Sequence, residues 1–144
     1  MATMLEQFKE TLRNAGVSVT AARCEVFEKV GSHGPLMMAD LVRLVQHSTD
    51  RASVYRAVEL FERLGIVQRI YTGWKYKLEL TDSFHEHHHH LTCTQCGTLY
   101  DIPEDSAIES YMQQLATAQQ FLMTKHQLEI QGVCSTCKNA APSN

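Results

Sequence analysis

Apolar residues in the first half of the chain recur at the spacing of amphipathic α-helices. Leu5, Phe8 and Leu12 share one helical face, which predicts a first helix that ends at Gly16. A second helix is expected to end before Gly31, because glycine commonly follows the last turn of a helix. Three helices are therefore predicted after the first, over residues 21–30, 38–45 and 51–64, with Thr20 and Asp50 as N-caps of the outer two.

After Gly65 the pattern changes to the one typical of β-strands. Residues 66–71 and 75–80 predict two strands, and residues 72–74 predict the turn between them. Helices followed by a two-stranded hairpin form a winged helix-turn-helix, in which the last helix is the recognition helix that enters the major groove of DNA. The helix over residues 51–64 is therefore the candidate recognition helix.

The face of this helix opposite its apolar stripe suits contact with DNA. Small Ala52 and Ser53 allow close approach to base edges. Tyr55 offers a ring to thymine methyl groups, and Arg56 can pair with phosphate or guanine. The alternative is an ordinary solvated helix whose arginines pair with neighbouring glutamates. The candidate contacts, including two on the hairpin, are Ala52, Ser53, Tyr55, Arg56, Lys75 and Lys77.

Two Cys-x-x-Cys pairs mark the second half of the chain. Cys93 and Cys96, followed by Gly97, form one pair, and Cys134 and Cys137 form the other. Two such pairs are typical of a closed, four-cysteine structural zinc site. A redox dithiol is the alternative for a single pair. A disulfide scaffold is not expected, because the chain is long enough to bury a core and has no signal-peptide pattern, so reduced thiols in the cytoplasm are predicted.

Four consecutive histidines, residues 87–90, precede the first cysteine pair. In a strand, alternation sends His88 and His90 to one face and His87 and His89 to the other, so one run can serve two metal sites. Nitrogen and oxygen ligands suit Fe, Zn, Mn, Co or Ni. The alternative is a solvated polar run. Acidic residues and a histidine that could complete the sites are Glu79, Asp82, Glu86, Glu109 and His126.

The net charge of −3 over 144 residues hides two unlike halves. Residues 1–77 hold 11 basic and 8 acidic residues, a net +3, whereas the remainder holds 2 and 8, a net −6. The first half suits an anionic partner and the second suits metal cations, although both could be plain solvated surfaces. No apolar run approaches the roughly 20 residues that span a bilayer, so no membrane partner is expected.

These motifs together resemble the ferric uptake regulator family of bacterial metal-responsive repressors. The resemblance covers roughly residues 5–137. Its three segments are Ala52-Ser53-Val54-Tyr55-Arg56, the histidine run leading into Cys93-x-x-Cys96-Gly97, and Cys134-x-x-Cys137. It implies an α+β fold, with a winged helix-turn-helix domain at residues 1–82 and a small α/β dimerisation domain with structural zinc at residues 83–144.

The resemblance also implies the roles of individual residues. The implied ligands of the structural zinc are Cys93, Cys96, Cys134 and Cys137. The implied ligands of a regulatory metal are Glu79, His88, His90 and a histidine of the first domain, for which His33 is the candidate. The implied ligands of a second metal are His87, His89, Glu109 and His126. Arg23 matches an arginine of the family that contacts DNA phosphate.

The implied function is metal-dependent repression of metal-uptake genes by a homodimer bound to a double-stranded DNA operator. Fe²⁺ is the expected regulatory metal, with Zn²⁺ or Mn²⁺ as alternatives. A zinc-, manganese- or peroxide-responsive member of the same family is the nearest alternative function. From other classes, a metalloenzyme would need a catalytic constellation that the sequence does not supply. A metal-storage or interaction module would use its helix-turn-helix only for protein contacts. No enzymatic activity and no small organic ligand are expected.

Overall fold

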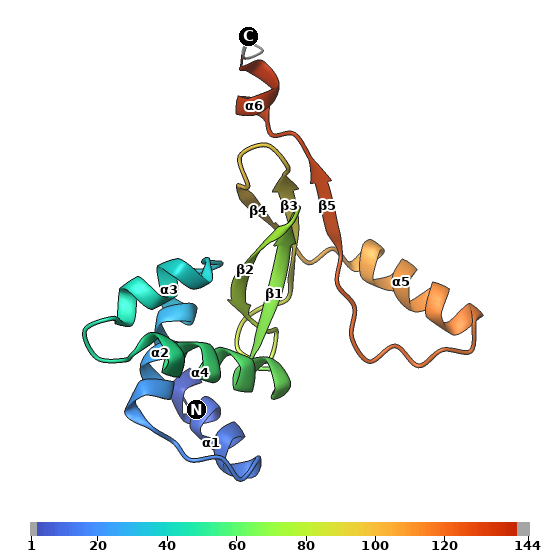
Figure 1. The fold of residues 1–144 in the computed structure, drawn as a ribbon. Coiled ribbons are helices and arrows are strands. Elements are labelled where there is room, and N and C mark those ends of the chain that lie inside the picture. The colour runs from blue at the N-terminus through green and yellow to red at the C-terminus, as the bar shows by residue number, and fades with distance from the viewer. Residues whose placement is uncertain (1–2, 141–144) are drawn as a thin grey trace. The chain divides into compact units, whose positions relative to one another are not determined.

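The computed structural model describes residues 3–140 and divides the chain into two compact units (Figure 1). We call residues 1–86 the N-terminal unit and residues 87–144 the C-terminal unit. The division falls a few residues beyond the boundary expected after residue 82. No helix within residues 3–140 is both long and apolar enough to cross a membrane.

The N-terminal unit contains four helices and a hairpin. Its elements are α1 (Met4–Asn14), α2 (Ala21–His33), α3 (Met38–Val45), α4 (Arg51–Arg63), β1 (Val67–Thr72) and β2 (Lys75–Leu80). The expected helix caps form, since Thr20 accepts a hydrogen bond from the Arg23 N–H and Asp50 accepts one from the Ser53 N–H. The strands pair antiparallel from Val67 opposite Leu80 to Thr72 opposite Lys75.

The expectation that α2 ends before Gly31 is wrong. The helix continues to His33, and Gly34 follows it with a φ of 64° that favours glycine. Gly31 lies inside α2 at a close packing point, where a Cβ atom would lie 3.1 Å from the Leu80 Cδ1 atom. Packing against β2 therefore accounts for this glycine.

Three phenylalanines form the centre of the N-terminal unit. The rings of Phe8 and Phe27 are stacked with centroids 4.1 Å apart, and Phe61 meets Phe8 edge-on at 5.2 Å. Each ring comes from a different helix, so α1, α2 and α4 are held around one core. This core buries the apolar stripe of α4 and leaves its other face exposed.

Replacing the N-cap of α2 tests how the sequence sets the start of that helix. Thr20→Ala removes the side-chain acceptor for the Arg23 N–H, and the free energy of unfolding is expected to fall by about 1 kcal/mol. Guanidinium denaturation measures the change. Thr20→Ser is the matched control, because it keeps the hydroxyl acceptor. Equal stability of the alanine variant and the wild type would contradict the prediction.

The C-terminal unit contains a three-stranded sheet and two helices. Its elements are β3 (His88–Cys93), β4 (Leu99–Pro103), α5 (Ser106–Ala118), β5 (Glu129–Gly132) and α6 (Ser135–Asn139). The central strand, β3, pairs antiparallel with β4 and parallel with β5. Among residues 87–140 the only buried apolar residue is Cys93, and α5 buries no side chain. This unit therefore needs stabilisation beyond its own apolar core.

Candidate metal sites and exposed recognition surface

The four cysteines of the two Cys-x-x-Cys pairs meet at one end of the three-stranded sheet. Parallel pairing of β3 with β5 sets Cys93 opposite Gly132, which brings Cys134 at the start of α6 to the first pair. All four Sγ atoms lie within 4.8 Å of one another. The Cys96 and Cys134 sulfurs are 3.8 Å apart, and sulfurs around a tetrahedral zinc ion with Zn–S bonds of about 2.3 Å lie about 3.8 Å apart. The donor set fits structural zinc.

Backbone N–H groups polarise this cluster. Those of Cys96 and Cys134 lower the pKa of Cys93 to about 6. The Cys134 N–H lies 3.4 Å from the Cys93 Sγ atom, and the Cys137 N–H donates to the Cys134 Sγ atom at 3.5 Å. The Cys137 thiol donates to the sulfur of Cys134, which raises the pKa of Cys137 to about 12. These shifts favour thiolate charge on Cys93 over Cys137, and a bound cation would favour deprotonation of the remaining thiols.

A second cluster lies on one face of β3. It consists of His87, His89, Glu109 and His126, whose ligand atoms are all within 4.8 Å of one another. The His89 Nε2 atom is 2.8 Å from Glu109 Oε1, and the His126 Nε2 atom is 3.1 Å from Glu109 Oε2. His89 is 2% exposed. Three imidazoles and a carboxylate converging in this way are a donor set that suits a divalent transition metal.

The electrostatics of this cluster favour an ionised carboxylate. Desolvation is the largest single influence on Glu109 and acts to raise its pKa. The hydrogen bond with His89 and the charges of the three imidazoles oppose it, and the net effect is a lowered pKa for Glu109. A carboxylate that is already charged is ready to act as a metal ligand.

The other face of β3 carries His88 and His90. Their ligand atoms lie within 4.8 Å of each other and of a carboxylate oxygen of Asp101 on β4. Antiparallel pairing sets His90 opposite Asp101, with the His90 Nε2 atom 3.6 Å from Asp101 Oδ1. Asp101 is a candidate ligand that sequence reasoning missed. Only the strand register pairs it with His90, and the sequence pattern does not specify that register.

Two proposed ligands of the regulatory metal, Glu79 and His33, belong to the N-terminal unit. Glu79 is 4% exposed on β2, where the Gln68 Nε2 group donates to its carboxylate at 3.3 Å. His33 ends α2, and its Nδ1 atom lies 3.0 Å from the Ser32 hydroxyl and 3.1 Å from the Lys29 carbonyl oxygen. Among residues 3–86, the ligand atoms of Glu79 and His85 lie within 4.8 Å of each other, whereas His33 joins no cluster of ligating side chains.

The exposed face of α4 is held in place by its own N-cap. The Asp50 carboxylate accepts hydrogen bonds from the Ser53 N–H at 3.0 Å and from the Ser53 hydroxyl at 2.6 Å. Both bonds lower the pKa of Asp50, and the bond from the Ser53 side chain has the larger effect. Arg56 donates to the same Ser53 hydroxyl oxygen at 3.0 Å, and Tyr55 is 37% exposed beside it. The guanidinium of Arg56 is therefore oriented before any ligand arrives.

Arg56 shares a cavity of about 250 Å³ with Arg23. The Arg23 guanidinium donates to the Ser18 hydroxyl oxygen at 2.8 Å. The lining residues, from the start of α2 and from α4, are Ser18, Thr20, Ala22, Arg23, Ser53, Arg56 and Ala57. The Glu62 carboxylate accepts from Arg69 of β1, at 2.5 and 2.8 Å, rather than pairing along α4. Two oriented guanidinium groups around one cavity can bind a phosphate. This arrangement favours a phosphate-binding role for this face over that of an ordinary solvated helix.

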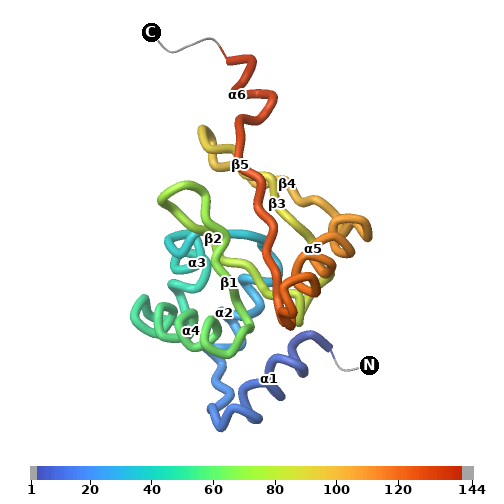
Figure 2. The backbone as a smooth tube through the Cα atoms, turned by 90° about the vertical axis from the view of Figure 1, so that its right-hand side faces the viewer, coloured from blue at the N-terminus to red at the C-terminus, as the bar shows by residue number. Residues whose placement is uncertain are grey.

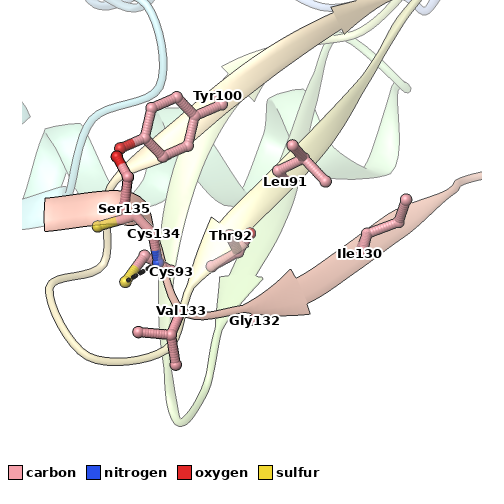
Figure 3. A pocket seen from close by; sticks show the side chains of 9 residues that line it. All are labelled: Leu91, Thr92, Cys93, Tyr100, Ile130, Gly132, Val133, Cys134 and Ser135. Carbon is pink, nitrogen blue, oxygen red and sulfur yellow. Dashed lines mark hydrogen bonds between the residues drawn. The ribbon is translucent and has the colours of Figure 1, made fainter. Parts of the chain in front are cut away.

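Another cavity, of about 290 Å³, lies beside the cysteine cluster (Figure 3). It is lined on the sheet side by Leu91 and by its partners on the neighbouring strands, Tyr100 and Ile130. These three side chains are 38%, 43% and 49% exposed. An apolar sheet face is thus left uncovered next to the four sulfurs.

Comparison with known proteins identifies the family of this chain. The family model described as the ferric uptake regulator family matches residues 14–131. The chain belongs to the ferric uptake regulator family. A ferric uptake regulation protein of Legionella pneumophila is 33% identical over 135 residues, which cover 90% of this chain and 97% of the relative.

Solved structures of regulators in this family have the same fold. The ferric uptake regulator of Vibrio cholerae matches with a TM-score of 0.71 and 28% identity, covering 88% of this chain and 99% of that one. The regulator of Francisella tularensis, solved with iron, matches with a TM-score of 0.71 and 25% identity, covering 86% and 96%. The expected family and α+β fold class are confirmed. Family membership also makes the protein a transcriptional regulator rather than an enzyme.

Proposed function

We propose that the protein is a metal-dependent, sequence-specific DNA-binding repressor of metal-uptake genes, with Fe²⁺ as its regulatory metal. The observation that carries this proposal is the separation of donor sets within the C-terminal unit. Four sulfurs form one cluster, and two sets of nitrogen and oxygen donors occupy opposite faces of β3. Separate donor sets allow a structural ion and an exchangeable regulatory ion to be bound by the same unit.

The four sulfurs are proposed to hold the structural zinc. Closed sets of four thiolates bind zinc so tightly that metal binding and folding become one process. The shortage of buried apolar residues in the C-terminal unit supports this assignment. Zinc at this position would supply the stability that the small core lacks.

The regulatory metal is proposed to bind His88 and His90, with Asp101 as a further ligand. The family resemblance adds Glu79 and His33. The cluster of His87, His89, Glu109 and His126 is proposed as the second site. Mixed nitrogen and oxygen donors suit Fe²⁺ and also Mn²⁺ and Zn²⁺. The expectation of iron is supported by the relatives named ferric uptake regulation proteins and by the Francisella tularensis structure with iron.

A second copy of the chain is proposed to cover the exposed apolar surface of the C-terminal unit. Leu91, Tyr100 and Ile130 lie on one face of the sheet, and α5 exposes Tyr111 and Leu115 by 61% and 51%. Exposed apolar surface of this kind marks protein–protein contact. A symmetric dimer would present two α4 helices to two half-sites of a DNA operator.

Metal titration of DNA binding tests the proposed function. Fluorescence anisotropy of a labelled duplex, selected by the protein from a random-sequence library, is measured anaerobically with Fe²⁺, Mn²⁺ or Zn²⁺. DNA affinity is expected to rise about 5- to 150-fold with the regulatory metal, the usual range of coupling between two binding sites. His90→Ala should remove this rise, whereas His47→Ala, in the loop after α3, should preserve it. Equal DNA affinity with and without every metal would refute metal sensing.

A further inference from the structure

The tip of the β1–β2 hairpin carries a tryptophan that does not contribute to the buried core of its unit. Trp74 is 88% exposed and is the only tryptophan in the chain. Strand pairing ends with Thr72 opposite Lys75, so Gly73 and Trp74 alone make the turn. Gly73 adopts a φ of 72°, which permits so tight a turn. The indole therefore projects from the end of a paired, ordered arm.

The base of the hairpin is fixed to the core, which leaves the tip free for contact. Leu78 and Leu80 at the far end of β2 are buried, whereas Lys75 at the tip is exposed. Backbone hydrogen bonds in both directions between Leu36 and Leu78 add a further attachment near the base. A rigid arm that presents a large aromatic group at its end loses little conformational entropy when it binds a partner.

Cations accompany the aromatic groups along the hairpin. The Lys75 ammonium lies 4.8 Å from the centre of the Trp74 ring, and the Arg69 guanidinium lies 4.4 Å from the centre of the Tyr76 ring. Arg69 also pairs with the Glu62 carboxylate of α4, so the positive charge for a partner comes from Lys75 and Lys77. Residues 67–78 contain no acidic residue. Single exposed apolar residues are ordinary on protein surfaces, but aromatic rings interleaved with cations are typical of nucleic-acid contacts.

The hairpin tip lies on the same side of the N-terminal unit as α4. Both are at the front in Figure 1 and towards the left in Figure 2, whereas α1 lies farther to the right in Figure 2. A duplex that receives α4 in its major groove presents its next minor groove to a hairpin beside that helix. The positive charge of the hairpin suits the phosphates of DNA, whereas the hairpins of two copies carry the same charge and repel each other.

We propose that Trp74 contacts the sugars and base edges of the minor groove adjacent to α4, with Lys75 on the flanking phosphate. The inference rests on the proposed DNA-binding function and adds a residue and a groove to it. Apolar side chains at such positions pack against or wedge between base steps. Trp74 thus supplies apolar contact in the groove, and Lys75 supplies the charge.

Intrinsic fluorescence tests the contact directly, because all tryptophan emission comes from Trp74. The metal-loaded protein is titrated with the library-selected duplex, and Trp74 emission is followed beside the anisotropy of labelled DNA. Emission is expected to change at the same DNA concentration as anisotropy. Trp74→Ala should weaken binding about 5- to 100-fold for each half-site that the dimer contacts, the range of one lost aromatic contact, and Trp74→Phe should recover most of it. Met4→Ala, an exposed apolar change on α1, is the control.

The outcomes separate this inference from the proposed function. If DNA binds by anisotropy while Trp74 emission stays constant and Trp74→Ala binds like the wild type, the hairpin contact is wrong and the DNA-binding function stands. If emission changes with protein concentration in the absence of DNA, the tip contacts another protein copy and the inference is overturned. If no metal induces DNA binding, the proposed function fails, and this inference fails with it.

Discussion

Cys96→Ser is expected to abolish zinc binding and to unfold the C-terminal unit while the N-terminal unit stays folded. Cys96 is the exposed member of the four-sulfur cluster, so serine there disturbs packing least. Loss of one thiolate would break the proposed tetrahedral site, and structural zinc in small zinc-binding domains contributes about 10–16 kcal/mol to folding. Among residues 87–140, Cys93 is the only apolar residue that is buried, so the core cannot compensate.

Two measurements read the two units separately. Zinc content is determined by mass spectrometry, and hydrogen exchange reports the protection of β3, β4 and β5. Hydrogen exchange in α1, α2 and α4 reports the N-terminal unit, because these helices surround its buried core. Cys24→Ala is the matched control, since it removes a thiol outside the cluster. Unchanged zinc content or unchanged protection of β3 in Cys96→Ser would show that the four sulfurs are not the structural site.

Arg56→Ala is expected to remove most of the specific DNA affinity of the metal-loaded protein. The Ser53 hydroxyl orients the Arg56 guanidinium, and Arg56 lines the cavity that it shares with Arg23. A charged contact to a base or phosphate contributes about 1–3 kcal/mol, and a dimer loses it twice, so about 2–6 kcal/mol of binding free energy should disappear. Binding is measured by anisotropy at several salt concentrations.

The matched control removes the same charge from the same helix. Arg63 is exposed in the last turn of α4 and does not line the cavity of Arg23 and Arg56. Arg63→Ala should therefore weaken DNA binding much less than Arg56→Ala. If Arg56 contacts phosphate, its loss should also reduce the salt dependence of binding, whereas a base contact would change sequence preference instead. Equal effects of the two substitutions would argue for nonspecific attraction by the whole helix.

Local patterns predicted the elements of the N-terminal unit closely. Each helix buries an apolar stripe, and the periodicity of such a stripe is set within the element itself. The misplaced end of α2 marks the limit of this reasoning. Gly31 looks like a helix terminator in the sequence, but its lack of a side chain serves contact with Leu80, far away along the chain. Close packing of this kind leaves no local signal.

The histidine run also shows what a local pattern predicts and what it leaves to tertiary packing. Alternation along a strand separates His88 and His90 from His87 and His89, and the structure places these pairs in different clusters. That alternation follows from strand geometry alone. The partners that complete each cluster, Asp101 on β4 and Glu109 on α5, come from other elements. Their proximity depends on strand register and helix placement, which short-range patterns do not encode.

By itself, the sequence determined the order of helices and strands in the N-terminal unit, the exposed face of α4, the two cysteine pairs and the family. All of these are carried by neighbouring residues or by spacing within a motif. Only the tertiary structure decided that Asp101 joins His90, that Arg23 and Arg56 line one cavity, and that Trp74 stands at the end of a fixed arm. These relations join residues from different elements, so they exist only once the chain has packed.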